Sequence, residues 1–157
     1  VISNIPYYLT SPIITKLIES KSKFDLIVLT IQKEVAKRIV SKPGTKEYGS
    51  FSIFVNYHTK PEIDSYIPKS AFIFQPEVGS AILKLNILNK PSIEVKDEKL
   101  FFRIVHAAFQ QRRKMLKNAL FAAHIKWPDK TDIDGKRRGE TLSIEEFARL
   151  SDSISFS

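Results

Sequence analysis

The stretch that most constrains the fold is a nearly unbroken apolar run, Phe-Asp-Leu-Ile-Val-Leu-Thr-Ile, at residues 24–31. Such a run is typical of a strand that is buried on both faces of a parallel sheet. Residues 1–3 read as the end of another buried strand, and apolar residues at helical spacing follow over residues 13–18. A strand, a helix and a strand in this order form a βαβ unit, which predicts the α/β class with a mostly parallel sheet.

Two more helices and two more strands are expected before residue 90. Amphipathic patterns predict the helices over residues 32–40 and 50–58. The strands are expected over residues 61–67 and 80–88, joined by a loop rich in Pro and Phe. Because the second strand alternates cleanly between apolar and polar residues, we place the two as an antiparallel pair at one edge of the sheet.

Only helical patterns follow the linker at residues 89–92. A helix is expected from a cap at Asp97 to residue 109, and residues 110–123 are expected to continue as helix with a basic face. The last helix has the clearest start signal in the chain, since Ser143 and Glu146 have the spacing of a capping box.

The change from strand to helical patterns predicts a domain boundary near residue 90. The 157 residues are enough for two small domains. Residues 1–90 are expected to form an α/β domain, and residues 91–157 are expected to form a small all-helical domain.

The chain is basic, with 25 Lys and Arg residues against 17 Asp and Glu residues and a net charge of +8 at pH 7. A positive field of this size favours a nucleic acid or another anionic partner, although a solvated Lys-rich surface has the same composition. The distribution is more informative, because residues 100–126 contain six basic residues and no acidic one. The six are Arg103, Arg112, Arg113, Lys114, Lys117 and Lys126.

The cysteine and histidine content excludes several kinds of site. The chain has no Cys, so it can form no disulfide, thiolate metal site or cysteine nucleophile, which fits a reducing, cytoplasmic location. Its three histidines are scattered without an H-x-x-x-H pair, so no metal site is expected. No stretch approaches the roughly 18 apolar residues of a membrane span, so no membrane contact is expected.

The strongest candidate site is Asn4-Ile5-Pro6-Tyr7, which follows the first strand at the edge where open α/β sheets bind ligands. The Asn4 amide oxygen and a carbonyl such as that of Ile5 or Pro6 can accept both hydrogens of the exocyclic amine of adenine. This favours positive charge on that nitrogen as it attacks a methyl group. Tyr7 can stack on a base flipped out of its helix. On four residues alone, a proline turn with Tyr7 and Tyr8 as half-buried aromatics remains an alternative.

Phe72 is the second candidate, because Pro68 and Pro76 stand four residues before and after it. Proline on both sides stiffens the loop and favours an exposed aromatic that can stack on the opposite face of the same base. A phenylalanine that packs against the loop or the core is the alternative.

The third candidate is a group of basic residues that can contact RNA phosphates. The cluster at residues 112–117 lacks acidic neighbours and ends a helix rich in Phe, although a solvated surface is the alternative. The RNA-binding candidates are Arg112, Arg113, Lys114, Lys117, Arg137 and Arg138.

The glycines set a limit on what the chain can bind. The five glycines form no G-x-G motif, so the chain cannot cradle a dinucleotide or the amino-acid end of S-adenosylmethionine in the usual glycine-rich loop.

Read together, five stretches resemble the ribosomal RNA adenine N6,N6-dimethyltransferases of the KsgA (RsmA) type, in the right order over essentially the whole chain. The first is Asn4-Ile5-Pro6-Tyr7, similar to the family's N-L-P-Y motif. The second is Gln32-Lys33-Glu34-Val35-Ala36-x-Arg38 with Pro43-Gly44-x-Lys46-x-Tyr48-Gly49, similar to Q-K-E-V-A-x-R and P-G-x-K-x-Y-G. The others are Ile67-Pro68-x-x-x-Phe72, Phe109-x-x-Arg112-Arg113-Lys114-x-Leu116-x-Asn118 and Arg138-x-Glu140-x-Leu142-Ser143-x-x-x-Phe147.

The resemblance implies the second half of a Rossmann-like methyltransferase domain, followed by a helical domain that engages RNA. It implies S-adenosylmethionine-dependent N6-dimethylation of two adjacent adenines in small-subunit (16S-type) rRNA, with the immature small ribosomal subunit as partner and a monomeric enzyme. The Arg112-Arg113-Lys114 stretch favours this type over the erythromycin-resistance methylases of large-subunit rRNA.

The resemblance also implies roles for the candidate residues. Asn4, Pro6 and Tyr7 are the catalytic residues, and Asn4 would also contact the cofactor. The substrate-binding residues would be Ile5, Tyr8 and Phe72.

The chain departs from the family pattern in two ways. The loop after Phe72 has Phe74 in place of a proline and Glu77 in place of a lysine, which puts the rigidity and charge of the loop in doubt. The glycine-rich loop and most of the cofactor pocket are expected before Val1, so the chain alone should bind S-adenosylmethionine poorly and be inactive. A non-catalytic rRNA-binding or ribosome-assembly module, or a transcription-factor offshoot of the same fold as in mitochondria, remains an alternative.

Overall fold

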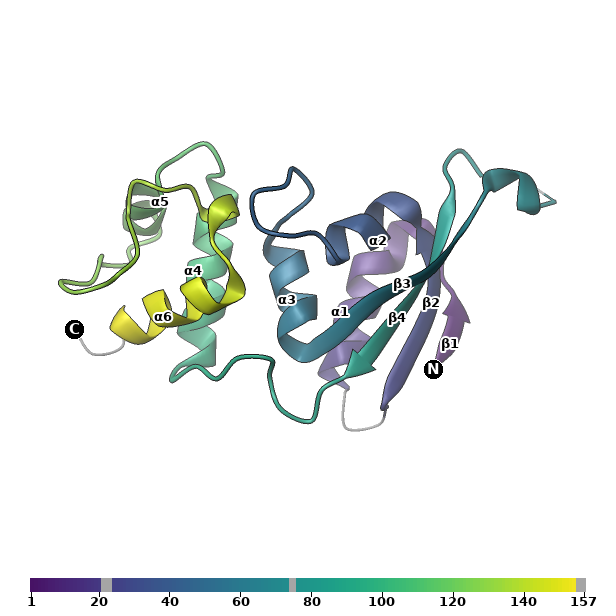
Figure 1. Ribbon diagram of the computed structural model, residues 1–157, viewed down its shortest axis with the longest axis horizontal. Helices are drawn as coiled ribbons and strands as arrows, with labels where there is room; N and C mark the ends of the chain where they lie inside the picture. The colour runs from purple at the N-terminus through teal and green to yellow at the C-terminus, as the bar shows by residue number, and fades with distance from the viewer. Residues whose placement is uncertain (21–23, 74–75, 155–157) are drawn as a thin grey trace. The chain divides into compact units, whose positions relative to one another are not determined.

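The computed structural model describes residues 1–20, 24–73 and 76–154, and among these it leaves out the side chain of Tyr7 (Figure 1). The chain forms two compact units: Val1–Ser41 with Val55–Ser92, and Lys42–Phe54 with Ile93–Ser157. The change of unit at Ser92 lies close to the expected boundary, whereas residues 42–54 group with the helical part. The assignment of a function to each part stays a prediction.

The first unit is built on a four-stranded sheet with the strand order β1-β2-β4-β3. β1 (Ile2–Asn4) pairs in parallel with β2 (Leu26–Gln32), while β4 (Ser80–Ile87) pairs antiparallel with both β2 and β3 (Thr59–Ile67). The α/β class and the antiparallel edge pair are confirmed. Among the described strands one pairing is parallel and two are antiparallel, because β4 returns between β2 and β3.

The core of the first unit lies on one face of this sheet. The fully buried side chains of β2 are Ile27, Leu29 and Ile31, whereas Val28 and Thr30 on the other face are only half-buried. The expected burial of both faces of β2 is therefore wrong for the described residues. Each fully buried Ile or Leu stabilises the fold by about 1.5–3 kcal/mol.

The first half of the first unit contains a 3-10 turn and two helices. The 3-10 turn is η1 (Tyr7–Leu9), in which the Leu9 N–H donates to the Pro6 carbonyl at 3.0 Å. The helix α1 (Thr10–Glu19) follows it directly. α2 (Lys33–Ile39) follows β2 directly and packs against the sheet. α3 (Ser50–His58) contains the division between the two units.

The second unit contains α4 (Glu98–Gln110), α5 (Leu116–Ala122), the 3-10 turn η4 (Gly139–Thr141) and α6 (Ile144–Ile154). Asp97 caps α4, since its carboxylate accepts the Leu100 N–H at 3.0 Å. The capping box of α6 is confirmed, with Ser143 N–H to Glu146 Oε2 at 2.9 Å and Glu146 N–H to Ser143 Oγ at 3.2 Å.

The expected continuation of one helix through residues 110–123 is wrong, although residues 116–122 are helical. α4 ends at Gln110, residues 111–113 form a turn, and α5 begins only at Leu116. The reason is tertiary, because the N–H groups of Leu116 and Lys117 donate to the carbonyls of Arg137 and Gly135 at 2.7 and 3.0 Å. Arg112, Arg113 and Lys114 therefore lie between the two helices instead of on a helix face, whereas Lys117 lies in the first turn of α5.

Tyr48 explains why residues 42–54 group with the helices. Its hydroxyl donates to the Leu142 carbonyl at 3.0 Å, and its ring meets the edge of Phe109 with centroids 5.7 Å apart. The side chain is 4 % exposed, and burial raises the pKa of the Tyr48 hydroxyl well above its ordinary value. The neighbouring Gly44 N–H donates to the Glu140 carbonyl at 2.8 Å.

Candidate functional site

The register of the sheet shows which loops share an edge. Asn4 is the last residue of β1 and pairs with Thr30 near the carboxyl end of β2. Ser80, the first residue of β4, pairs with Gln32 at the end of β2 and with Ile67 at the end of β3. The loops that follow β1 and β3 therefore leave the sheet at the same edge, which carries both Asn4 and Phe72.

The backbone after β1 presents polar groups to solvent because one residue anchors it. Ile5 is 6 % exposed, while Asn4 and Pro6 on either side of it are exposed. The position of Asn4 at the carboxyl end of a strand is confirmed. An amide at such an edge is accessible to a ligand.

The two aromatics after Pro6 differ in what is known of them. Tyr8 is 83 % exposed, which does not fit the alternative of a half-buried aromatic and leaves its ring accessible to a substrate. The side chain of Tyr7 lies outside the described residues, so its expected stacking role stays a prediction. Its backbone is part of η1.

Phe72 is half-exposed and follows the 3-10 turn η3 (Lys69–Ala71), which lies beyond the ends of β3 and β4 (Figure 1). β3 is three strands away from β1, or roughly 14 Å at the usual strand spacing. Phe72 is thus on the same edge as Asn4. Both can touch one base only if the loop after β3 leans toward β1.

The described residues of the first unit include no glycine-rich loop of the kind that usually holds S-adenosylmethionine. They offer the exposed amide of Asn4 and one glycine, Gly79, at the start of β4. A Cβ at Gly79 would make only an ordinary contact, 3.5 Å from the Ile67 carbonyl oxygen. Within the described part of the chain, no group of three or more His, Asp or Glu side chains could hold a metal ion.

No helix among the described residues is long and apolar enough to cross a membrane.

Arg112 is held by groups of its own unit. Its Nε and Nη2 atoms donate to Glu140 Oε2 at 3.2 and 2.9 Å, and Nη2 also donates to the Lys46 carbonyl at 3.1 Å. The guanidinium therefore ties the turn after α4 to η4 and to residues 42–54.

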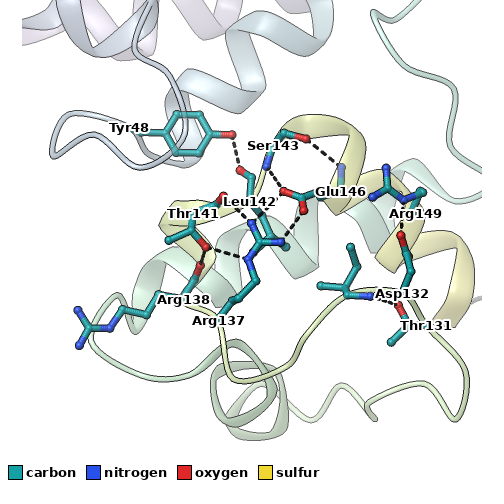
Figure 2. A network of polar contacts seen from close by, with 11 residues as sticks. Tyr48, Thr131, Asp132, Arg137, Arg138, Thr141, Leu142, Ser143, Glu146 and Arg149 are labelled. Atoms are coloured by element: carbon teal, nitrogen blue, oxygen red, sulfur yellow. Dashed lines mark hydrogen bonds and ion pairs between the residues drawn. The ribbon is translucent and has the colours of Figure 1, made fainter.

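Arg137 is held in the same way (Figure 2). Its Nη1 and Nη2 atoms donate to Glu146 Oε1 and Oε2 at 2.5 and 3.1 Å, and Nη2 also donates to the Thr141 carbonyl at 2.7 Å. The hydrogen bond from Arg137 holds the pKa of the Glu146 carboxyl below its usual range. A two-point pair of this kind is stronger and more directional than a single contact.

The other four basic candidates, Arg113, Lys114, Lys117 and Arg138, are exposed. Figure 2 shows the Arg138 guanidinium pointing away from the polar network around Arg137. The backbone bonds from Leu116 and Lys117 to Arg137 and Gly135 bring the start of α5 next to the stretch that carries Arg137 and Arg138.

The sequence did not identify the carboxylates that hold the arginines. Glu140 was noted only as part of a motif, and Glu146 only as part of the capping box. The available signal was the spacing of Arg137 and Glu146 on either side of a short turn, which allows the two side chains to meet.

The family model for "Ribosomal RNA adenine dimethylase" matches residues 1–155. The chain is 45% identical over 159 residues to "Ribosomal RNA small subunit methyltransferase A" of Clostridium acetobutylicum, covering 98% of this chain and 58% of that protein. It is 48% identical over 160 residues to the protein of the same name from Caldanaerobacter subterraneus, covering 98% of this chain and 59% of that protein.

Two solved structures share the fold. A dimethyladenosine transferase from Plasmodium falciparum superposes with a TM-score of 0.77 at 23% identity, covering 95% of this chain and 64% of that one. The 23S rRNA methyltransferase ErmE superposes with a TM-score of 0.71 at 20% identity, covering 98% of this chain and 64% of that one.

The chain spans a little under three fifths of the two named bacterial relatives. The family model nevertheless covers both compact units, from the strand that carries Asn4 to the end of α6. The chain therefore belongs to the ribosomal RNA adenine dimethylase family.

Proposed function

We propose that this chain supplies the target-adenine side and the RNA-engaging part of an S-adenosylmethionine-dependent N6-dimethyltransferase of small-subunit rRNA. The observation that carries the proposal is the exposed Asn4 at the carboxyl end of β1, anchored by buried Ile5 within the family match. The immature small ribosomal subunit as partner, a monomeric enzyme and a cytoplasmic location are parts of the same proposal.

The chemistry asks the protein to stabilise positive charge on a nitrogen. The amine of adenine is a poor nucleophile, because its lone pair is delocalised into the ring. When N6 gains a methyl group it becomes positively charged, and it then loses one of its protons. Acceptors aimed at the two N–H groups stabilise this charge more in the transition state than in the ground state.

Asn4 Oδ1 is the first of these acceptors, and the carbonyl of Ile5 is the second. The Pro6 carbonyl already accepts the Leu9 N–H at 3.0 Å as the first bond of η1. Of the two carbonyls that the sequence left open, Ile5 is therefore the better choice, and Pro6 instead shapes the turn. Tyr7, Tyr8 and Phe72 would hold the ring of the base by stacking.

S-adenosylmethionine would supply the methyl group. Because the described residues include no glycine-rich loop for it, we assign to this chain only a contact through Asn4. The rest of its pocket would belong to another part of the protein.

The six basic residues proposed to engage RNA differ in exposure and fall into two groups. Arg113, Lys114, Lys117 and Arg138 are exposed and can contact phosphates, whereas Arg112 and Arg137 are engaged with glutamates. We propose that the first four contact RNA directly and that the other two hold the turn that presents them.

The test is methyl transfer to undermethylated small subunits by the full-length protein that carries this sequence. Asn4→Ala should abolish transfer and leave subunit binding nearly unchanged, because the removed amide acts on the reacting nitrogen. Asn89→Ala, at an exposed position in the linker, is the control and should retain transfer. Normal turnover by Asn4→Ala would overturn the proposed site, and subunit binding without transfer by the wild type would favour the non-catalytic module.

A further inference from the structure

A cavity of about 630 Å³ lies beside α5 in the second unit. Its volume falls within the range of small-molecule sites. Among its lining residues are Lys117, Phe121, Lys126, Trp127, Asp129 and Asp134. None of these except Lys117 belongs to the site proposed above.

Phe121 is exposed although it lies on a helix that packs into the core. The buried side of α5 consists of Leu116, Ala119 and Leu120, while Phe121 is 81 % exposed. The core of the unit therefore does not need this ring. An exposed ring in the lining of a cavity is available to stack on a nucleic-acid base.

Trp127 and Gly135 also line the cavity, and Gly135 lies directly against α5, since its carbonyl accepts the Lys117 N–H at 3.0 Å. A Cβ at Gly135 would lie 3.1 Å from Trp127 Cζ2 and 3.0 Å from Lys117 Cβ, so the indole and α5 both pack closely against this backbone. The end of α5 is also fixed, because Arg103 Nη2 donates to the Ala123 carbonyl at 3.1 Å. The two rings are thus held on a firm framework.

The charged groups at the cavity are of both signs. Lys117 and Lys126 are exposed cations, and Lys126 Nζ lies 3.8 Å from Asp129 Oδ1 in a pair that is more than three-quarters exposed. Such a pair is weak and opens easily. The lysines can therefore reach a phosphate, and the carboxylates can accept the amino hydrogens of a base.

We propose that this cavity binds one unpaired nucleotide of RNA, with its base stacked on Phe121 and Trp127 and its phosphate between Lys117 and Lys126. The inference rests on the proposed function, since rRNA is the substrate there. Lys117 is common to the cavity and to the exposed basic cluster, so a strand that crosses that cluster can continue into the cavity. Single-stranded RNA is recognised by this combination of stacking rings and backbone cations.

The test uses the fluorescence of Trp127, which is the only Trp of the chain. Titration with a short single-stranded oligoadenylate should quench it, because a stacked base contacts the indole. Phe121→Ala should lower the affinity for the oligonucleotide roughly tenfold, as expected for the loss of one stacking ring. Phe121→Tyr should bind as the wild type does, and Phe121→Leu should bind as weakly as Phe121→Ala.

Lys117→Ala should lower the affinity and the salt dependence of binding, whereas Lys99→Ala, at an exposed position on α4, should change neither. Unchanged fluorescence on RNA binding, or wild-type affinity of Phe121→Ala, would overturn the nucleotide site. Quenching by an acidic peptide but not by RNA would also overturn it, in favour of a protein-docking site.

Failure of this inference is distinguishable from failure of the proposed function. If Arg113→Ala weakens RNA binding while Phe121→Ala does not, the RNA-engaging surface stands and the nucleotide site falls. If the oligonucleotide quenches Trp127 and Phe121→Ala removes the effect while Asn4→Ala retains methyl transfer, the nucleotide site stands and the catalytic proposal falls.

Discussion

The second unit contains two Arg-Arg pairs, Arg112-Arg113 and Arg137-Arg138, that occupy different turns but follow one rule. In each pair the first guanidinium binds a glutamate, Glu140 or Glu146, and the second is exposed. The pairs differ in how deep the bound arginine lies, since the Arg112 side chain is 40% exposed and that of Arg137 is 33% exposed.

The contrast between the bound and the exposed arginine of each pair shows that equal charges in neighbouring positions can have different physical roles. A guanidinium that is bound to a glutamate and to a backbone carbonyl contributes to the stability of the fold. An exposed guanidinium contributes to the positive field and remains free to contact an anion. A count of basic residues along the chain does not separate the bound arginines from the exposed ones. The positions of the partner carboxylates do separate them.

The largest expected effect comes from Gly139, directly after the second pair. A Cβ there would lie 2.6 Å from Ala108 Cβ, so Gly139→Ala should push η4 away from α4 and cost about 1–3 kcal/mol of unfolding free energy. Urea unfolding measures it. Gly49→Ala is the matched control, because a Cβ at Gly49 meets no atom within 4 Å. Equal stability of the two variants would show that η4 tolerates a shift.

The next effect separates the members of the second pair. Arg137→Ala should cost about 1–2 kcal/mol of unfolding free energy, because it removes the two-point contact with Glu146 and a contact with Thr141. Arg138→Ala should stay within about 0.5 kcal/mol, because its side chain is exposed. Urea unfolding of both variants measures these losses of unfolding free energy. Equal losses would contradict the distinction between the bound and the exposed arginine.

RNA binding should show the reverse order. Arg113→Ala combined with Arg138→Ala should lower affinity for single-stranded rRNA fragments roughly fivefold. It should also reduce the salt slope by about 0.7 for each phosphate that the protein no longer neutralises. Filter binding at several salt concentrations measures both quantities. An unchanged slope would make the two exposed arginines mere surface.

The smallest effect is a pH dependence of the Arg137 contribution. The Arg137 hydrogen bond depresses the pKa of Glu146 in the folded state from an ordinary value of 4.5, so the stabilisation is fully present above that value. It is lost as the pH falls through the folded-state pKa. The stability gap between the wild type and Arg137→Ala should therefore be constant near pH 7 and shrink below about pH 4.5. A gap that does not change would assign it to packing alone.

The sequence predicted best what is local. The cap at Asp97 and the box of Ser143 and Glu146 were predictable, because both motifs span four residues and need no other part of the chain. Asn4 was placed correctly at a strand end for the same reason, since the apolar run and the turn residues adjoin each other.

Contacts between distant residues were not predictable. Residues 110–115 contain no Gly or Pro, so nothing in them signals the end of a helix. The break follows from bonds to Arg137 and Gly135, which lie about 20 residues further along the chain. The grouping of Tyr48 with the helices depends likewise on Leu142.

The distance between the two candidate site residues Asn4 and Phe72 was likewise not predictable from the sequence. The motif around Phe72 indicated an aromatic loop, but its separation from Asn4 depends on the strand order, which places β2 and β4 between β1 and β3. A single sequence does not state this order.

Glu146 serves two neighbours with one carboxylate, because Oε2 accepts both from the Ser143 N–H and from Arg137. In evolutionary terms, positions 137, 143 and 146 are not independently variable. A change of the side chain at 146 removes the hold on Arg137 and one of the two capping bonds of α6 in one step, and no single replacement at 137 restores both. The substitutions tolerated at these three positions are therefore coupled through one carboxylate.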